Sequence, residues 1–118
     1  MKLTASLLPV LCFSLVGLVA SSCKKCKDEA PRARIANNGT QVASVQVKTS
    51  GGNTINVNNV AAGATSEYAS YAAGQTTFTL KINNVDYVKA FDASQCHEYT
   101  VAIDRNNAIT VTDVDRND

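Results

Sequence analysis

The sequence lacks the residues and motifs on which most common enzyme classes depend. It has a single histidine, His97, and no tryptophan. Gly-x-Ser-x-Gly, His-Glu-x-x-His and Gly-x-x-x-x-Gly-Lys are all absent, which excludes the usual serine-hydrolase, zinc-protease and phosphate-loop arrangements. A lone histidine among scattered acids is also poor material for a zinc site. We therefore predict no enzymatic activity, no cofactor and no metal.

The sequence also lacks a strong excess of either charge. Its 118 residues carry 11 Lys and Arg against 10 Asp and Glu, so the formal net charge is +1. Proteins that bind nucleic acid usually present a basic patch or stripe. We therefore predict no nucleic-acid partner.

Helical periodicity is absent as well. After Pro31 the apolar residues recur at every second position, which is the period of a half-buried strand, and turn residues follow roughly every 8 to 12 residues. The clearest strand is 77–82, where Phe78, Leu80 and Ile82 alternate with polar residues. Asn83-Asn84 after it is a hairpin signal.

This rhythm predicts an all-β domain at 32–114. About seven antiparallel strands should form two packed sheets, because a single sheet would leave one apolar face in water. A small barrel is the alternative. Short strands are predicted at 67–71, with Tyr68 pointing inward, and at 85–90, followed by a longer crossover at 91–97. Residues 115–118 are predicted to be a polar tail.

An apolar leader begins the sequence. Lys2 supplies a positive charge, 3–20 is largely apolar and small residues follow, so 1–22 is predicted to be an export signal. The alternative is a retained membrane-spanning helix, since the stretch approaches the roughly 20 residues that cross a bilayer. Pro9 and Gly17 interrupt it, and the lysines that follow would be expected to stay cytoplasmic, which would keep the domain inside the cell.

The end of the leader, Val19-Ala20-Ser21-Ser22-Cys23, resembles the lipobox of bacterial lipoproteins. In that family the cysteine is acylated and becomes the new N-terminus, so the resemblance implies a lipidated Cys23, carrying palmitate or a similar chain. Ala20 stands where the family usually has leucine. Two or more acyl chains hold a protein stably on a membrane. The lipid bilayer is therefore the predicted partner of Cys23.

Residues 23–31 are predicted to be a tether between the lipid anchor and the domain. They are charged, lack apolar periodicity and end at Pro31. Asp28-Glu29 resembles the acidic signal that sends some Gram-negative lipoproteins to the outer face of the outer membrane. The two resemblances imply a bacterial cell-envelope protein anchored to the outer membrane and exposed at the cell surface, where a protein or glycan partner could bind.

A third resemblance covers most of the chain after Arg32. Asn59-Val60-Ala61-Ala62-Gly63, Ala72-Ala73-Gly74-Gln75-Thr76 and Tyr99-Thr100-Val101 are similar to segments of small immunoglobulin- or transthyretin-like sandwich domains of uncharacterised bacterial lipoproteins. The resemblance implies a sandwich and no activity. It predicts no ligand-binding residue.

Two cysteines remain besides Cys23 and the leader's Cys12. Outside the cytoplasm Cys26 and Cys96 can form a disulfide, and the alternative is two free thiols. The bridge would pin the tether to the predicted crossover and contribute roughly 4 kcal/mol. Cys96 and His97 also suggest a nucleophile and base, but neighbours in an extended segment point to opposite sides. His97 is instead predicted to be an exposed loop residue.

The sequence therefore predicts a membrane-anchored, non-enzymatic interaction or accessory module. Two other functions stay open: a carrier of a small ligand or metal ion in loops at one end of the sandwich, and a surface-fibre or adhesin-type subunit that pairs through an open strand edge. Residues 104–107 and 113–118 carry oxygen ligands for calcium without EF-hand spacing, and a turn and a solvated tail are their predicted roles. Whichever of Tyr68 and Tyr71 the core leaves free could mark a binding surface.

Overall fold

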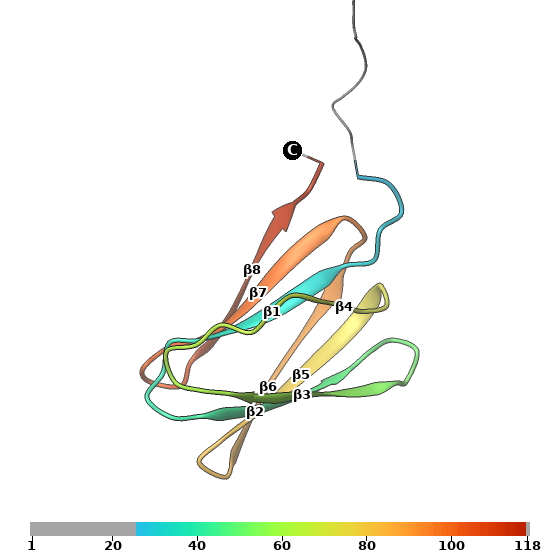
Figure 1. Ribbon diagram of the computed structural model, residues 1–118. Helices are drawn as coiled ribbons and strands as arrows, with labels where there is room; N and C mark the ends of the chain where they lie inside the picture. Colours follow the sequence, from blue (N-terminus) through green and yellow to red (C-terminus); the bar gives the residue numbers. More distant parts are fainter. Residues whose placement is uncertain (1–25, 118) are drawn as a thin grey trace, which may run out of the picture.

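The computed structural model describes residues 26–117, which form eight β-strands and no helix (Figure 1). The strands are β1 (Arg32–Asn37), β2 (Ala43–Lys48), β3 (Thr54–Val60), β4 (Ala69–Ser70), β5 (Gly74–Ile82), β6 (Val85–Ala93), β7 (His97–Ile103) and β8 (Ile109–Asp115). No helix within this part of the chain is long and apolar enough to cross a membrane. The predicted export signal at 1–22 and the predicted lipidation of Cys23 lie outside the described residues.

The strands form two four-stranded sheets. The β7 sheet has the order β4-β1-β7-β8, and the β5 sheet has the order β3-β2-β5-β6. Consecutive strands pair as hairpins at β2–β3, β5–β6 and β7–β8, and the other connections pass from one sheet to the other. This arrangement confirms the predicted all-β, two-sheet sandwich.

One pairing departs from the predicted antiparallel pattern. β1 and β7 run parallel, from Arg32 opposite Glu98 to Asn37 opposite Ile103. Parallel strands begin at the same end of a sheet, so the segments that precede β1 and β7 lie side by side. This pairing brings residues 26–31 next to the loop at 94–96, although the two are far apart in sequence.

The core lies between the sheets and follows the two-residue rhythm of the strands. Phe78 and Leu80 of β5 are fully buried, as are Val47 of β2 and Val101 of β7. Leucine-sized and aromatic side chains buried in this way each contribute roughly 1.5–3 kcal/mol. The buried cluster comprises Ala33, Ile35, Ala43, Val45, Val47, Val60, Tyr71, Phe78, Leu80, Ile82, Ala93, Tyr99, Val101 and Ile103.

Three predicted boundaries differ from the structure. β6 continues to Ala93 because it stays in register with β5 through Gly74, and β7 starts at His97, so the crossover predicted at 91–97 shrinks to 94–96. β8 continues to Asp115, one residue into the predicted polar tail. Eight strands form rather than about seven, although β4 has only two residues.

The inward residue of the predicted strand at 67–71 is Tyr71 rather than Tyr68. Tyr68 is 38% exposed, whereas Tyr71 is 6% exposed and packs edge-on against Phe78. The backbone N–H of Tyr71 donates to the carbonyl of Pro31, which fixes the register of this segment against β1. Burial raises the pKa of the Tyr71 phenol above its ordinary value, so this side chain stays neutral in the core.

Asn37 is a buried polar residue at the end of β1. Its side-chain amide nitrogen donates to the carbonyl oxygens of Gln41, at 2.8 Å, and Val60, at 2.9 Å. Its side-chain oxygen accepts a hydrogen bond from the backbone N–H of Gly39 at 3.0 Å. One side chain therefore satisfies three backbone groups of two loops.

Replacing Asn37 with alanine is expected to lower the free energy of unfolding by about 2–4 kcal/mol, because three backbone groups lose their partner. Denaturant titration of the variant measures this loss. The exposed neighbour Asn38 is the matched control, and Asn38→Ala should change the same quantity by less than about 0.5 kcal/mol. Equal stability of the two variants would show that Asn37 does not hold these loops.

Candidate functional site at the N-terminal junction

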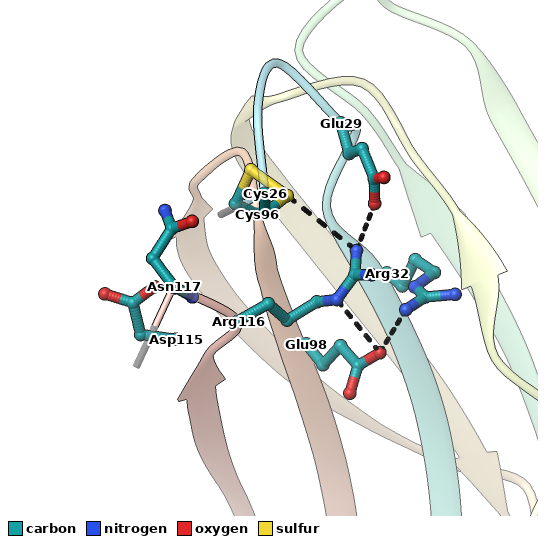
Figure 2. A network of polar contacts seen from close by, with 8 residues as sticks. All are labelled: Cys26, Glu29, Arg32, Cys96, Glu98, Asp115, Arg116 and Asn117. Carbon is teal, nitrogen blue, oxygen red and sulfur yellow. Dashed lines mark hydrogen bonds and ion pairs between the residues drawn. A yellow bond between two sulfur atoms is a disulfide. The ribbon is translucent and has the colours of Figure 1, made fainter. Parts of the chain in front are cut away.

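The described chain enters the sandwich at a disulfide between Cys26 and Cys96 (Figure 2). The two Cα atoms are 5.7 Å apart, and 70 residues separate them in sequence. Figure 1 shows that the end of β8 lies at this same end of the sandwich. We call the cluster of side chains around this bond the junction: Cys26, Glu29, Arg32, Cys96, Glu98 and Arg116.

Backbone hydrogen bonds hold both sides of the disulfide. The N–H of Cys96 donates to the carbonyl of Glu29 at 3.0 Å, and the N–H of Arg116 donates to the carbonyl of Cys96 at 2.8 Å. Cys96 has a φ of 63°, in the left-handed region that non-glycine residues seldom adopt. The Tyr99 hydroxyl accepts a hydrogen bond from the N–H of Ser94 at 2.8 Å. These three hydrogen bonds and the disulfide therefore hold the loop in an uncommon conformation.

Four charged side chains form a continuous chain across the junction. Arg32 of β1 pairs with Glu98 of β7, which is its direct register partner. Arg116 pairs with Glu29 through Nη1 and approaches Glu98 Oε2 with Nε at 3.6 Å. The charges alternate and sum to zero, so the network joins the N-terminal segment, two strands and the C-terminal end without adding net charge.

The disulfide contributes more to the junction than the ion pairs do. Glu29 is 54% exposed and Arg32 is 36% exposed, and exposed pairs contribute about 0–1 kcal/mol each. Closing a loop of 70 residues contributes roughly 4 kcal/mol in the chain-entropy treatment. The arrangement is therefore suited to fixing the N-terminal segment mechanically, with the ion pairs setting its orientation.

His97 is neither in a loop nor fully exposed, contrary to the sequence-based prediction. It is the first residue of β7, and its side chain is 25% exposed. Its Nδ1 lies 3.7 Å from a carboxylate oxygen of Asp113, and its Nε2 lies 3.9 Å from one of Asp115. Since Cys96 is in the disulfide, it is no nucleophile for His97 to activate.

The two predicted oxygen-rich segments have ordinary structural roles. Asp104 Oδ1 accepts hydrogen bonds from the backbone N–H groups of Asn106, at 2.8 Å, and Ala108, at 2.9 Å, which makes it the cap of the β7–β8 turn. Asp113 and Asp115 belong to β8. Among residues 26–117 no group of three or more His, Cys, Asp or Glu side chains is placed to hold a metal ion.

A shallow, open groove of about 360 Å³ lies on the outer face of the β5 sheet. Its lining includes Ser44, Gln46, Asn56, Thr79, Lys81 and Asp86. It lies on a sheet face rather than among the end loops where a ligand carrier was predicted to bind. Val45 and Val57 add apolar surface to the amides and hydroxyls of this lining, and Lys81 forms a weak ion pair with Asp86 at 3.9 Å.

The sequence predicted only some of the residues that form the junction. It singled out Cys26 and Cys96, which the structure joins, and Cys23, which lies outside the described residues. It missed the roles of Glu29, Glu98 and Arg116. Glu98 lies in β7, whose pairing with β1 is not local, and Arg116 directly follows β8, which pairs with β7. No spacing in the sequence signals that these residues lie near Glu29.

Two four-stranded sheets around one apolar core define the class of this chain as a small β-sandwich. Among solved structures with a similar fold is the NMR structure of the protein from Eubacterium rectale, with a TM-score of 0.53 and 15% sequence identity. The similarity covers 72% of this chain and 88% of that chain, and it shows the fold alone. No family model and no curated protein matches the sequence.

Proposed function

We propose that this protein is a bacterial cell-envelope lipoprotein, anchored through an acylated Cys23 to the outer membrane, whose sandwich is a non-enzymatic interaction or accessory module. The observation that carries the proposal is the lipobox-like sequence that ends at Cys23, three residues before the disulfide-bonded Cys26. The disulfide at Cys26 would attach a lipid-bearing N-terminus firmly to the sandwich, which supports the proposal.

The chemistry of the described residues supports an interaction role rather than catalysis. The only histidine faces two carboxylates, and Cys96 is bonded to Cys26. Asp104 is used by a turn. Within 26–117 no nucleophile and base are held within hydrogen-bond reach of each other, which covalent catalysis requires.

The two alternative functions have less support. The groove on the β5 sheet is shallow and open, whereas pockets for small molecules are usually concave and enclose most of the ligand. Two of the four edge strands, β6 and β8, carry charges on the side that faces the other sheet: Lys89 is opposite Phe78, and Asp113 is opposite Tyr99. Charges that point inward on edge strands oppose the addition of a further strand at these two edges.

Replacing Cys23 with serine is expected to move the protein from the membrane fraction to the soluble fraction, because the variant would lose its acylation site. Fractionation of cells, with metabolic labelling by a palmitate analogue, measures both effects. The label should be present in the wild-type chain and absent from Cys23→Ser.

Cys12→Ser is the matched control, since it removes a cysteine of the leader and leaves Cys23 intact. This control should stay in the membrane fraction and keep its label. If Cys23→Ser were still membrane-bound after a high-salt wash, the lipid anchor would be refuted.

A further inference from the structure

We propose that Arg34, Tyr68 and Thr100 form a carboxylate-binding subsite on the outer face of the β7 sheet, where acidic side chains of a partner protein dock. The inference rests on the proposed interaction role and deepens it, because it names the face, the residues and the chemistry of the partner. The subsite adjoins the junction, because the central carbon of the Arg32 guanidinium lies 5.9 Å from the centroid of the Tyr68 ring, and it is separate from the groove on the β5 sheet.

Strand register brings the three side chains into one row. β4 pairs with the start of β1, with Arg32 opposite Ser70 and Ala33 opposite Ala69, and the same register continued by one residue places Tyr68 beside Arg34. On its other side Arg34 is the register partner of Thr100 in β7. An aromatic ring, a guanidinium and a hydroxyl therefore lie side by side across the sheet.

Two contacts hold the Arg34 guanidinium in place. Its central carbon lies 4.7 Å from the centroid of the Tyr68 ring, and its Nε donates to the Thr100 hydroxyl oxygen at 3.2 Å. The bond to Thr100 uses Nε and leaves both terminal nitrogens without an acceptor among residues 26–117. A guanidinium presents such nitrogens as a planar pair that matches the two oxygens of a carboxylate.

Arg34 differs from the other arginines of this face in having no carboxylate partner. Arg32 pairs with Glu98, and Arg116 pairs with Glu29 and Glu98. No carboxylate of residues 26–117 lies within 4.0 Å of the Arg34 nitrogens. One oriented positive charge is therefore left on an otherwise balanced surface.

The composition of the subsite favours a protein partner. Tyrosine and arginine are enriched at protein interfaces, where they provide most of the binding energy. Tyr68 is 38% exposed, and Arg34 is partly exposed, so both are accessible. A flat sheet face with one fixed cation is suited to aspartate or glutamate on a protein surface rather than to a small molecule, which would need a concave pocket.

The test measures binding of poly-L-glutamate to the immobilised full-length chain in a nonionic detergent. Arg34→Gln should weaken binding at least about tenfold, because a hydrogen-bonded charge pair is lost. Arg34→Lys should recover only part of the affinity, since lysine has no planar pair of donors. Tyr68→Phe keeps the ring and should bind as the wild type does.

Arg105→Gln is the matched control, because Arg105 is exposed in the β7–β8 turn at the far end of the sheet. It should retain affinity within about twofold. No binding by the wild type, equal losses in Arg34→Gln and Arg105→Gln, or binding of alginate without binding of poly-L-glutamate would each overturn the proposal. Because the membrane anchor is tested through Cys23, these outcomes refute the subsite and leave the anchor test unaffected.

Discussion

Replacing both Cys26 and Cys96 with serine is expected to lower the free energy of unfolding by about 4 kcal/mol. The bond closes a loop of 70 residues, which contains six complete strands, so its loss restores much conformational freedom to the unfolded chain. For a domain of this size, a loss of that magnitude lowers the unfolding midpoint by roughly 15 to 30 °C. Thermal unfolding of the variant, followed by circular dichroism, measures the shift.

The wild type in excess reductant is the companion experiment. It should unfold at the midpoint of the double variant, and reductant should not change the variant itself. Arg116→Gln, which breaks two partly exposed ion pairs of the junction and keeps the disulfide, should cost no more than about 2 kcal/mol. If reductant left the unfolding midpoint of the wild type unchanged, the disulfide would not contribute to stability.

The disulfide also changes the reach of the proposed anchor. A free tether over 23–31, fully extended, would place the sandwich up to about 30 Å from the lipid surface. With Cys26 bonded to Cys96, only the peptide from Cys23 to Cys26 is left to span that gap, which is about 10 Å at most. The proposed lipoprotein would therefore be held close to the bilayer, with the junction end nearest to it.

Local pattern was sufficient to predict the strands of the sandwich. Phe78, Leu80 and Ile82 alternate with polar residues in β5, and all three are buried as expected. Successive side chains of a strand point to opposite faces of the sheet, so an apolar residue at every second position places all of them on the buried face. The Asn83-Asn84 turn also forms as predicted, with positive φ at both residues. These features depend only on neighbours in sequence.

Features that depend on distant partners were not predicted. Tyr68 and Tyr71 flank the two-residue strand β4, and the hydrogen bond from the Tyr71 N–H to the Pro31 carbonyl decides which of them points inward. The parallel pairing of β1 with β7 has no signature in either strand. It nevertheless places Glu29 beside Cys96 and Arg34 beside Thr100, so it determines both the junction and the proposed subsite.

Replacing Phe78 with alanine is expected to lower the free energy of unfolding by about 3–5 kcal/mol. Phe78 is completely buried at the centre of the β5 sheet. Its ring lies 6.0 Å from that of Tyr71 and 5.7 Å from that of Phe91, so alanine would leave a cavity between two aromatic rings. Urea titration followed by tyrosine fluorescence measures the loss.

Phe78→Leu distinguishes loss of volume from loss of aromatic character at this position, and Val88→Ala is the control for truncation at an exposed position. Phe78→Leu keeps most of the volume and should cost less than about 1.5 kcal/mol, whereas Val88→Ala, at an exposed position of β6, should cost less than about 0.5 kcal/mol.

The core also contacts the junction through Phe91. The centroid of its ring lies 4.8 Å from that of Tyr99, and the Tyr99 hydroxyl holds the loop before Cys96. The cavity left by Phe78→Ala should therefore loosen the junction as well. We expect the disulfide to be reduced faster in Phe78→Ala than in Phe78→Leu, measured as the rate of reduction by a soluble thiol. Equal reduction rates would mean that the core and the junction are independent.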